Sequence, residues 1–147
     1  MRGYAATENT MESWDGTKLF YRAWIPEQQP NRAVLLFHRG HEHSARLIDL
    51  VEQLNLGEDF AYFAWDARGN GKSPGERDYA ETFSVYARDA DCFASHISDK
   101  YKIEISQMAL IANSVGAVIA CSWVHDYAPP IKALVMAAPA FRIKLYI

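Results

Sequence analysis

Four short runs of apolar residues dominate the pattern of the 147-residue chain. They cover residues 33–38 (AVLLFH), 61–65 (AYFAW), 108–112 (MALIA) and 133–138 (ALVMAA). Uninterrupted apolar runs of about four to eight residues are typical of strands that are buried on both faces of a parallel sheet. The pattern therefore predicts four such strands.

Amphipathic segments separate these runs. Residues 44–54 (SARLIDLVEQL) place their leucines, isoleucine and valine mostly on one helical face, and residues 82–97 (TFSVYARDADCFASHI) repeat apolar side chains at helical spacing. A third helix is expected directly after Ser114. Strands that alternate with helices imply right-handed crossovers and a mostly parallel sheet with helices on both faces, which is an α/β fold.

The first part of the chain has a different pattern. Residues 6–26 contain two extended stretches on either side of Asp15-Gly16, a dipeptide favoured in tight turns, and Pro26 ends the second stretch. This predicts a hairpin that adds antiparallel strands at one edge of the sheet. No internal repeat or low-complexity linker divides the chain, so we expect one unit over residues 1–147.

Composition narrows the classes of partner. Half of the residues are hydrophobic and the formal net charge is -3, which is typical of a soluble globular unit that buries roughly two thirds of its surface. No basic stripe indicates nucleic acid or an anionic membrane. No apolar run reaches the roughly 18 residues of a membrane span, and the N-terminus lacks the apolar core of a secretion signal. We expect no nucleic acid, no stable membrane insertion and a cytoplasmic location.

Ligands of such sheets bind beyond the carboxyl ends of the strands, and HRGHEHS follows the first predicted strand. Three interpretations are open. His38, His41 and His43 offer metal ligands, although no periodicity aims them inward. The segment is otherwise a polar turn with exposed side chains before a helix capped by Ser44. Alternatively, the turn points a backbone N–H, that of Gly40, into the space above the sheet as half of an oxyanion hole.

The second predicted strand is followed by DARGNGKSPG, in which Gly71-Lys72-Ser73 invites comparison with a phosphate-binding loop. Asp66 stands where that loop needs a glycine, and Pro74 would stop the helix whose N-terminus must hold the phosphates. We therefore expect no nucleotide and no other cofactor. The segment predicts a glycine-rich turn in which Asp66 and Arg68 tie loops together.

The third predicted strand ends in Ala112-Asn113-Ser114-Val115-Gly116. A nucleophile elbow is written G-x-S-x-G, because small residues on both sides of the serine allow a tight turn between strand and helix. Here alanine replaces the first glycine, and the alternative is a serine that merely caps the helix. In an elbow, the N–H of Val115 and that of Gly40 donate to the developing oxyanion.

Together these segments resemble the α/β-hydrolases, in particular the lysophospholipase and monoacylglycerol-lipase-like group with its serine-aminopeptidase relatives. SWDGTKLFYRAW resembles the opening hairpin of that group, LLFHRGHEHS its oxyanion turn, WDARGNGKSPG its following turn and ANSVGA its elbow. Arg39 and His41 stand where the group usually has small residues, and Ala112 replaces a glycine. The sequences of these segments most resemble bacterial proteins in which a hydrolase half precedes a methyltransferase half. This resemblance implies a fused C-terminal domain.

A nucleophilic serine needs a histidine and an acid, which follow it in this fold. After Ser114 the sequence holds one histidine, His125, and one acid, Asp126, and both lie about 16 Å along the helix that begins at the serine. They cannot complete a triad. We therefore expect a truncated hydrolase domain, inactive alone, with an apolar edge at residues 133–138 and with the acid and histidine supplied later. An unusual alternative uses His38 as the base.

The resulting hypothesis is a serine hydrolase of carboxylic esters, with acylglycerol or lysophospholipid substrates implied by the resemblance. Ser114 attacks the carbonyl and forms an acyl-enzyme, while the N–H groups of Gly40 and Val115 hold the oxyanion. The expected partner is a small-molecule ester or lipid. Two alternatives remain: a non-catalytic hydrolase-fold interaction module, and an amide-cleaving aminopeptidase relative.

Overall fold

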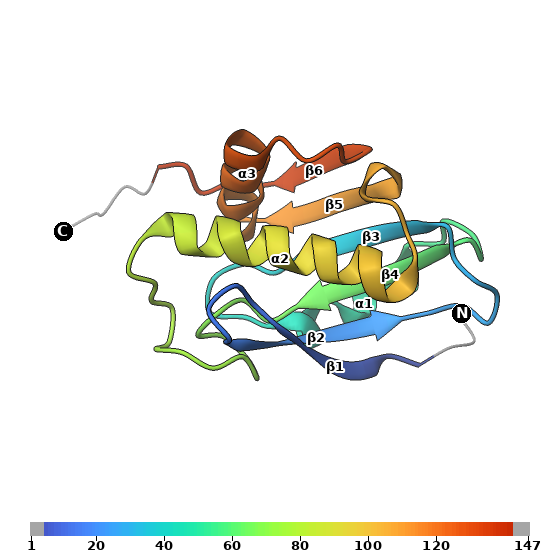
Figure 1. Cartoon of the computed structure of the whole chain (residues 1–147), viewed down its shortest axis with the longest axis horizontal. Helices are drawn as coiled ribbons and strands as arrows, with labels where there is room; N and C mark the ends of the chain where they lie inside the picture. Colours follow the sequence, from blue (N-terminus) through green and yellow to red (C-terminus); the bar gives the residue numbers. More distant parts are fainter. Residues whose placement is uncertain (1–4, 143–147) are drawn as a thin grey trace.

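The computed structural model describes residues 5–142, which form one twisted sheet with strand order β1-β2-β4-β3-β5-β6 (Figure 1). The strands are β1 (Thr7–Glu12), β2 (Lys18–Trp24), β3 (Arg32–Phe37), β4 (Phe60–Trp65), β5 (Met108–Asn113) and β6 (Ala133–Ala137). The helices are α1 (Ile48–Gln53), α2 (Phe83–Tyr101) and α3 (Val115–Tyr127), with short 3-10 turns η1 (Ser44–Leu47) and η2 (Ile105–Gln107).

The N-terminal hairpin forms as its turn dipeptide predicts. β1 pairs antiparallel with β2, and β2 pairs antiparallel with β4 at the edge of the parallel part. Gly16 adopts a φ of 83°, which glycine tolerates without steric cost, and its N–H donates to the Ser13 carbonyl at 3.0 Å. The antiparallel edge expected from the sequence is therefore confirmed.

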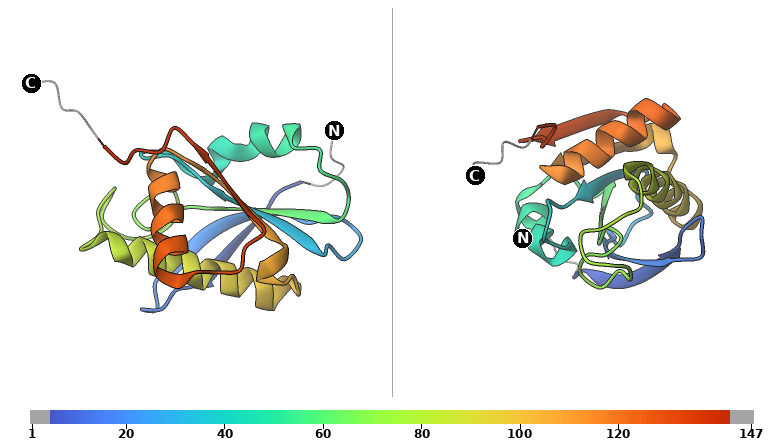
Figure 2. Two further views of the ribbon diagram at one scale, coloured as in Figure 1. Left: turned by 90° about the horizontal axis from the view of Figure 1, so that it is seen from above. Right: turned by 90° about the vertical axis from the view of Figure 1, so that its left-hand side faces the viewer.

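Helices cover both faces of the sheet, with α1 on one side and α2 and α3 on the other (Figure 2). Alternate residues of β3 separate into two apolar clusters: Leu35 and Phe37 face the side of α2 and α3, and Leu36 faces the side of α1. The Phe37 and Trp65 rings stack at 4.2 Å between centroids. Because full burial of such side chains stabilises by roughly 1.5 to 3 kcal/mol each, these two layers hold the strand ends in place.

β6 is predicted from the sequence to be a strand buried on both faces and also an apolar edge of the sheet; the first expectation is wrong and the second is confirmed. It pairs in parallel with β5 but lies at the edge of the sheet, and within residues 5–142 no element pairs with its other side. Val135 is 53% exposed and Met136 is 40% exposed, so this run is not buried on both faces. An edge strand and a central strand can share the same apolar composition, because burial depends on neighbours elsewhere in the chain.

The segment from Ser44 is less regular than the predicted helix. It begins as the turn η1 and continues as the six-residue α1. The Ser44 hydroxyl does not cap it: that hydroxyl is buried without a partner, and the Ser44 N–H donates to Asp66 Oδ1 at 2.6 Å. The orphan N–H of this turn is therefore satisfied by a carboxylate from the end of β4. Among the described helices, none is long and apolar enough to cross a bilayer.

Candidate active site

Ser114 forms the sharp turn between β5 and α3. Its φ of 54° and ψ of -120° lie in a region that residues other than glycine rarely adopt. The Ser114 N–H donates to the Ala137 carbonyl at 2.9 Å, and the Ser114 carbonyl accepts from Ala117 at 3.1 Å, so neighbours on both sides hold the turn. The hydroxyl makes no cap bond and has no hydrogen-bond partner within residues 5–142. Ser114 thus occupies the N-cap position of α3, but the interpretation that its hydroxyl caps the helix is wrong.

The small residues of the motif have different surroundings. A methyl group on Gly116 would lie 2.4 Å from the His38 carbonyl oxygen and 2.9 Å from that of Phe37, so α3 passes the end of β3 at a distance that only glycine allows. Ala112, at the position of the first glycine, is buried in the core with 1% exposure. Its extra methyl group is thus accommodated inside the sheet layer, and the turn keeps its shape.

His38 determines which way the next peptide points. Its Nδ1–H donates to the Arg39 carbonyl at 2.7 Å, and its Nε2 accepts from the Ala67 N–H at 2.9 Å. The Arg39 carbonyl belongs to the same peptide unit as the Gly40 N–H, and in a trans peptide these two groups point in opposite directions. The Gly40 N–H therefore points away from the His38 ring.

Gly40 and Val115 lie next to each other at the two strand ends. A methyl group on Gly40 would be 3.5 Å from Val115 Cγ1. Within residues 5–142 neither of their N–H groups has a hydrogen-bond acceptor. Both residues and Ser114 line one cavity of about 590 Å³. The structure thus brings the three residues singled out in the sequence to a single site.

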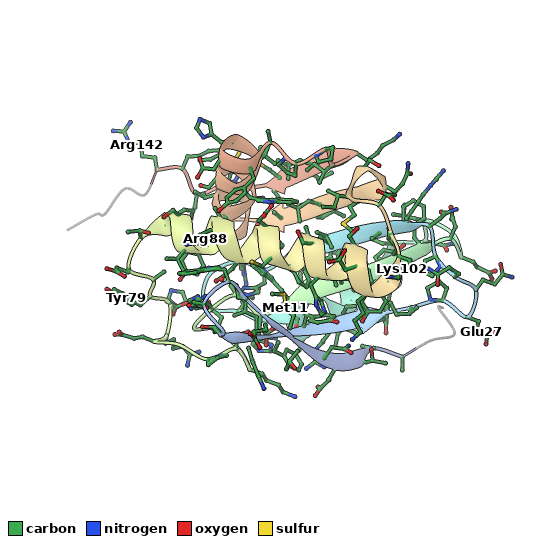
Figure 3. All side chains as sticks on the ribbon, viewed as in Figure 1. Met11, Glu27, Tyr79, Arg88, Lys102 and Arg142 are labelled. Atoms are coloured by element: carbon green, nitrogen blue, oxygen red, sulfur yellow. The ribbon has the colours of Figure 1, made fainter. Side chains whose placement is uncertain are left out.

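The walls of this cavity differ in polarity. Two loops contribute polar groups at its rim, and the segment before and at the start of α2 contributes aromatic rings. Figure 3 shows Tyr79 at the end of the molecule to which the arrows of β4, β5 and β6 point. The large apolar side chains of the lining include Tyr79, Phe83, Tyr86, Val118 and Ile119. An apolar group of a ligand can pack there while its polar part reaches Ser114.

Within residues 5–142 no histidine is hydrogen-bonded to the Ser114 hydroxyl. His38 is only 3% exposed and both of its ring nitrogens are engaged, which corrects the expectations of an exposed side chain and of a possible base. His125 bonds to its neighbour Asp126 on the exposed end of α3. His41 pairs with Asp78. Residues 5–142 contain no group of three potential ligands arranged to hold a metal ion.

The buried His38 should make the free energy of unfolding depend on pH. Burial lowers the pKa of His38 in the folded protein, so as the pH falls below roughly 6.5 the unfolded chain takes up a proton first. The free energy of unfolding should therefore fall between that pH and the lower pKa of the folded state, and not above it. Urea denaturation at pH 7.5 and 5.5 measures the change.

A His38→Gln variant should lose that part of the pH dependence, whatever its absolute stability. His125→Gln changes an exposed histidine on α3 and serves as the matched control, which should keep the wild-type slope. If His38→Gln keeps the full slope, the buried neutral imidazole is not its source.

The loop after β4 folds around a carboxylate. Asp66 accepts the N–H groups of Ser44 at 2.6 Å and Lys72 at 2.8 Å, and a methyl group on Gly71 would lie 2.2 Å from its Oδ2. Ser73 Oγ donates to the Asp66 carbonyl at 2.5 Å. The segment that resembles a phosphate loop therefore already surrounds an anion of its own chain. The predicted tying role of Asp66 is confirmed.

Comparisons with known proteins agree with this architecture. Residues 28–147 match the family model described as serine aminopeptidase, S33. Protein YnbC of Escherichia coli is 46% identical over 142 residues, which is 95% of this chain and 24% of YnbC. Human monoglyceride lipase is 31% identical over 126 residues, which is 85% of this chain and 40% of the lipase.

A solved structure extends the match to the fold. The α/β hydrolase GrgF from Penicillium superposes with a TM-score of 0.79 at 16% identity, covering 92% of this chain and 46% of GrgF. The chain thus spans less than half the length of these relatives. The chain belongs to the serine aminopeptidase S33 family and has the α/β-hydrolase fold, with monoglyceride lipases among its relatives.

Proposed function

We propose that the protein is a serine hydrolase that cleaves carboxylic esters, with Ser114 as the nucleophile. One observation carries the proposal: an unpartnered hydroxyl on a strained turn shares a cavity with the two unsatisfied N–H groups of Gly40 and Val115. Strain of this kind, about 1 to 3 kcal/mol, persists where the surrounding structure enforces it, and it clusters at active sites. The turn is then the nucleophile elbow.

In the proposed mechanism Ser114 Oγ attacks the ester carbonyl carbon and its proton passes to a base. The carbonyl oxygen becomes an oxyanion and accepts hydrogen bonds from Gly40 and Val115, each donor contributing about 3 to 4 kcal/mol to the transition state. The carbon–oxygen bond to the alcohol then breaks, and the alcohol leaves with the proton. Water cleaves the remaining acyl-enzyme by the same steps and releases the carboxylic acid.

The base and its acid are proposed to lie beyond residue 147. Within residues 5–142 no imidazole nitrogen is hydrogen-bonded to the Ser114 hydroxyl. Proton transfer requires a separation of roughly 3 Å between the two heavy atoms, directly or through one water. A histidine from a later segment of the protein would meet the hydroxyl from the open side of the cavity.

The cavity favours an ester with an apolar acyl group. Its aromatic and aliphatic wall provides apolar contact area, and its rim carries Arg39, His41 and Asn70, which suit a small hydroxylated alcohol. Monoglyceride lipases are among the relatives of the chain. We therefore propose acylglycerols or lysophospholipids as substrates. Comparing their hydrolysis with that of aminoacyl amides separates this proposal from an aminopeptidase activity, which the family description favours.

A fluorophosphonate probe on the full-length protein tests the nucleophile. We expect one labelled site in the tryptic peptide of residues 103–132, which contains Ser106, Ser114 and Ser122. Ser122→Ala should keep the label and Ser114→Ala should lose it. A protein that stays unlabelled would support the alternative of a non-catalytic module, and a label that survives Ser114→Ala would refute the assignment.

A further inference from the structure

A side-chain hydrogen bond crosses the rim of the Ser114 cavity. His41, in the turn after β3, donates from Nδ1 to Asp78 Oδ2 at 2.7 Å, and Asp78 lies in the loop between β4 and α2. The backbone N–H of His41 also approaches Asp78 Oδ1 at 3.4 Å, and Asn70 Nδ2 donates to the same oxygen at 2.7 Å. These three residues line the cavity that contains Ser114. We call His41 and Asp78 the rim pair.

Both members of the rim pair have left-handed backbones, with φ of 59° at His41 and 53° at Asp78. Residues other than glycine adopt this conformation at a cost in free energy of typically about 1 to 3 kcal/mol, which is lowest for asparagine and aspartate. The His41 side chain is 82% exposed, so its hydrogen bond to Asp78 stabilises the fold by at most about 1 kcal/mol. Stability therefore does not account for two strained residues joined across two loops.

The position of the rim pair next to Gly40 offers a better explanation for these two strained residues. Gly40 lies between two peptide units: the His38 ring holds the preceding one through the Arg39 carbonyl, and Asp78 holds the following one through the His41 N–H and ring. Glycine is the most flexible residue of a chain. With both flanking peptides held, the two torsions of Gly40 have little freedom, and its N–H keeps one direction.

The groups around Asp78 keep its carboxylate ionised, so that it can accept the hydrogen bonds from His41. Burial acts to raise the pKa of Asp78, but hydrogen bonds from Asn70 and His41 outweigh it, and the pKa lies below its usual range. Arg77 Nε lies 3.9 Å from Asp78 Oδ2, and its side chain is exposed. Arg39 is instead paired with Glu42 inside the turn. Asp78 therefore stays ionised as the acceptor that joins the turn to the opposite loop.

We propose that Asp78 is a positioning residue, which acts through His41 to keep the Gly40 N–H aimed at the oxyanion. This inference rests on the proposed esterase function and adds Asp78, which the sequence patterns did not indicate. Asp78→Ala in the full-length protein should lower kcat about 10- to 100-fold, since complete loss of an oxyanion donor costs about 10²- to 10³-fold. KM should change less than about threefold, because uniform substrate binding is not affected.

Three further variants sharpen the test. Asp78→Asn keeps an acceptor oxygen and should recover most of kcat. His41→Gly removes the other end of the hold, so it should match Asp78→Ala, and the double variant should lose no more than either single one. Glu42→Gln breaks the ion pair within the same turn and is the control, with kcat expected within about twofold of wild type. Circular dichroism verifies folding of each variant.

The outcomes distinguish the two proposals. If the wild-type protein neither hydrolyses esters nor reacts at Ser114, the proposed function fails and this inference fails with it. If the wild type is active and Asp78→Ala keeps its kcat, only the inference is overturned. A raised KM with unchanged kcat would show that the rim pair binds substrate instead, and additive losses in the double variant would show that the two residues act separately.

Discussion

Replacing Ser114 with alanine is expected to lower kcat for ester hydrolysis by about 10⁶-fold, the size of loss typical when the nucleophilic serine of such a triad is removed. The free energy of unfolding should stay within about 0.5 kcal/mol of wild type. The Ser114 hydroxyl has no partner within residues 5–142, so its removal leaves no polar group unsatisfied there. Steady-state kinetics and urea denaturation of the full-length protein measure both quantities.

Ser114→Gly separates strain from chemistry. Alanine keeps the unfavourable backbone conformation at φ 54° and ψ -120°, whereas glycine adopts it freely. The glycine variant should therefore be as inactive as the alanine variant but about 1 kcal/mol more stable than wild type. Retention of more than a tenth of kcat in Ser114→Ala would contradict nucleophilic attack by this residue. An unchanged stability of Ser114→Gly would show that the turn stores no strain.

The parts of the fold that the sequence predicts correctly have local causes. Asp15-Gly16 specifies a turn by its own backbone preferences, and the apolar runs of β3 and β4 favour extended structure by their own composition. The site follows from topology in the same way. Ser114 and Gly40 each follow a parallel strand, and the carboxyl ends of parallel strands meet at one edge. The motifs and the expected parallel arrangement of the strands were therefore sufficient to predict that they meet.

The features that the sequence did not predict depend on distant partners. His38 is held by the N–H of Ala67, and His41 is held by Asp78 from a loop 37 positions away. A polar segment such as HRGHEHS has no periodicity that indicates which of its histidines turn inward. The sequence around Asp78 contains no motif that indicates a role for this aspartate. The one available signal was His41, which stands where the resembling group usually has a small residue.

The second large effect is expected at Asp89, a carboxylate on α2 whose side chain has 0% exposure. It accepts hydrogen bonds from Arg68 Nε at 2.9 Å and Nη2 at 2.8 Å and from Ser13 Oγ at 2.6 Å. Arg68 also pairs with Asp15 of the hairpin turn at 2.7 Å. One guanidinium thus joins the N-terminal hairpin, the turn after β4 and the long helix.

Asp89→Ala should lower the free energy of unfolding by about 3 to 5 kcal/mol, because it leaves a largely buried guanidinium without its main partner. The arginine cannot escape this cost by losing its proton, because a guanidinium stays protonated in proteins and Asp15 still accepts its hydrogen bonds. Asp89→Asn keeps one acceptor and should cost roughly half as much. Urea denaturation measures each variant.

Glu8→Gln provides the comparison for this buried network. Glu8 bonds to Arg22 at 2.7 Å and to Lys72 at 2.8 Å, yet its side chain is 49% exposed, so its loss should destabilise the fold far less than the loss of Asp89. Similar bond lengths then give different stabilities because only the network of Asp89 is removed from water. If Asp89→Ala costs as little as Glu8→Gln, water reaches Arg68, and the anchoring of the hairpin to α2 depends on apolar packing alone.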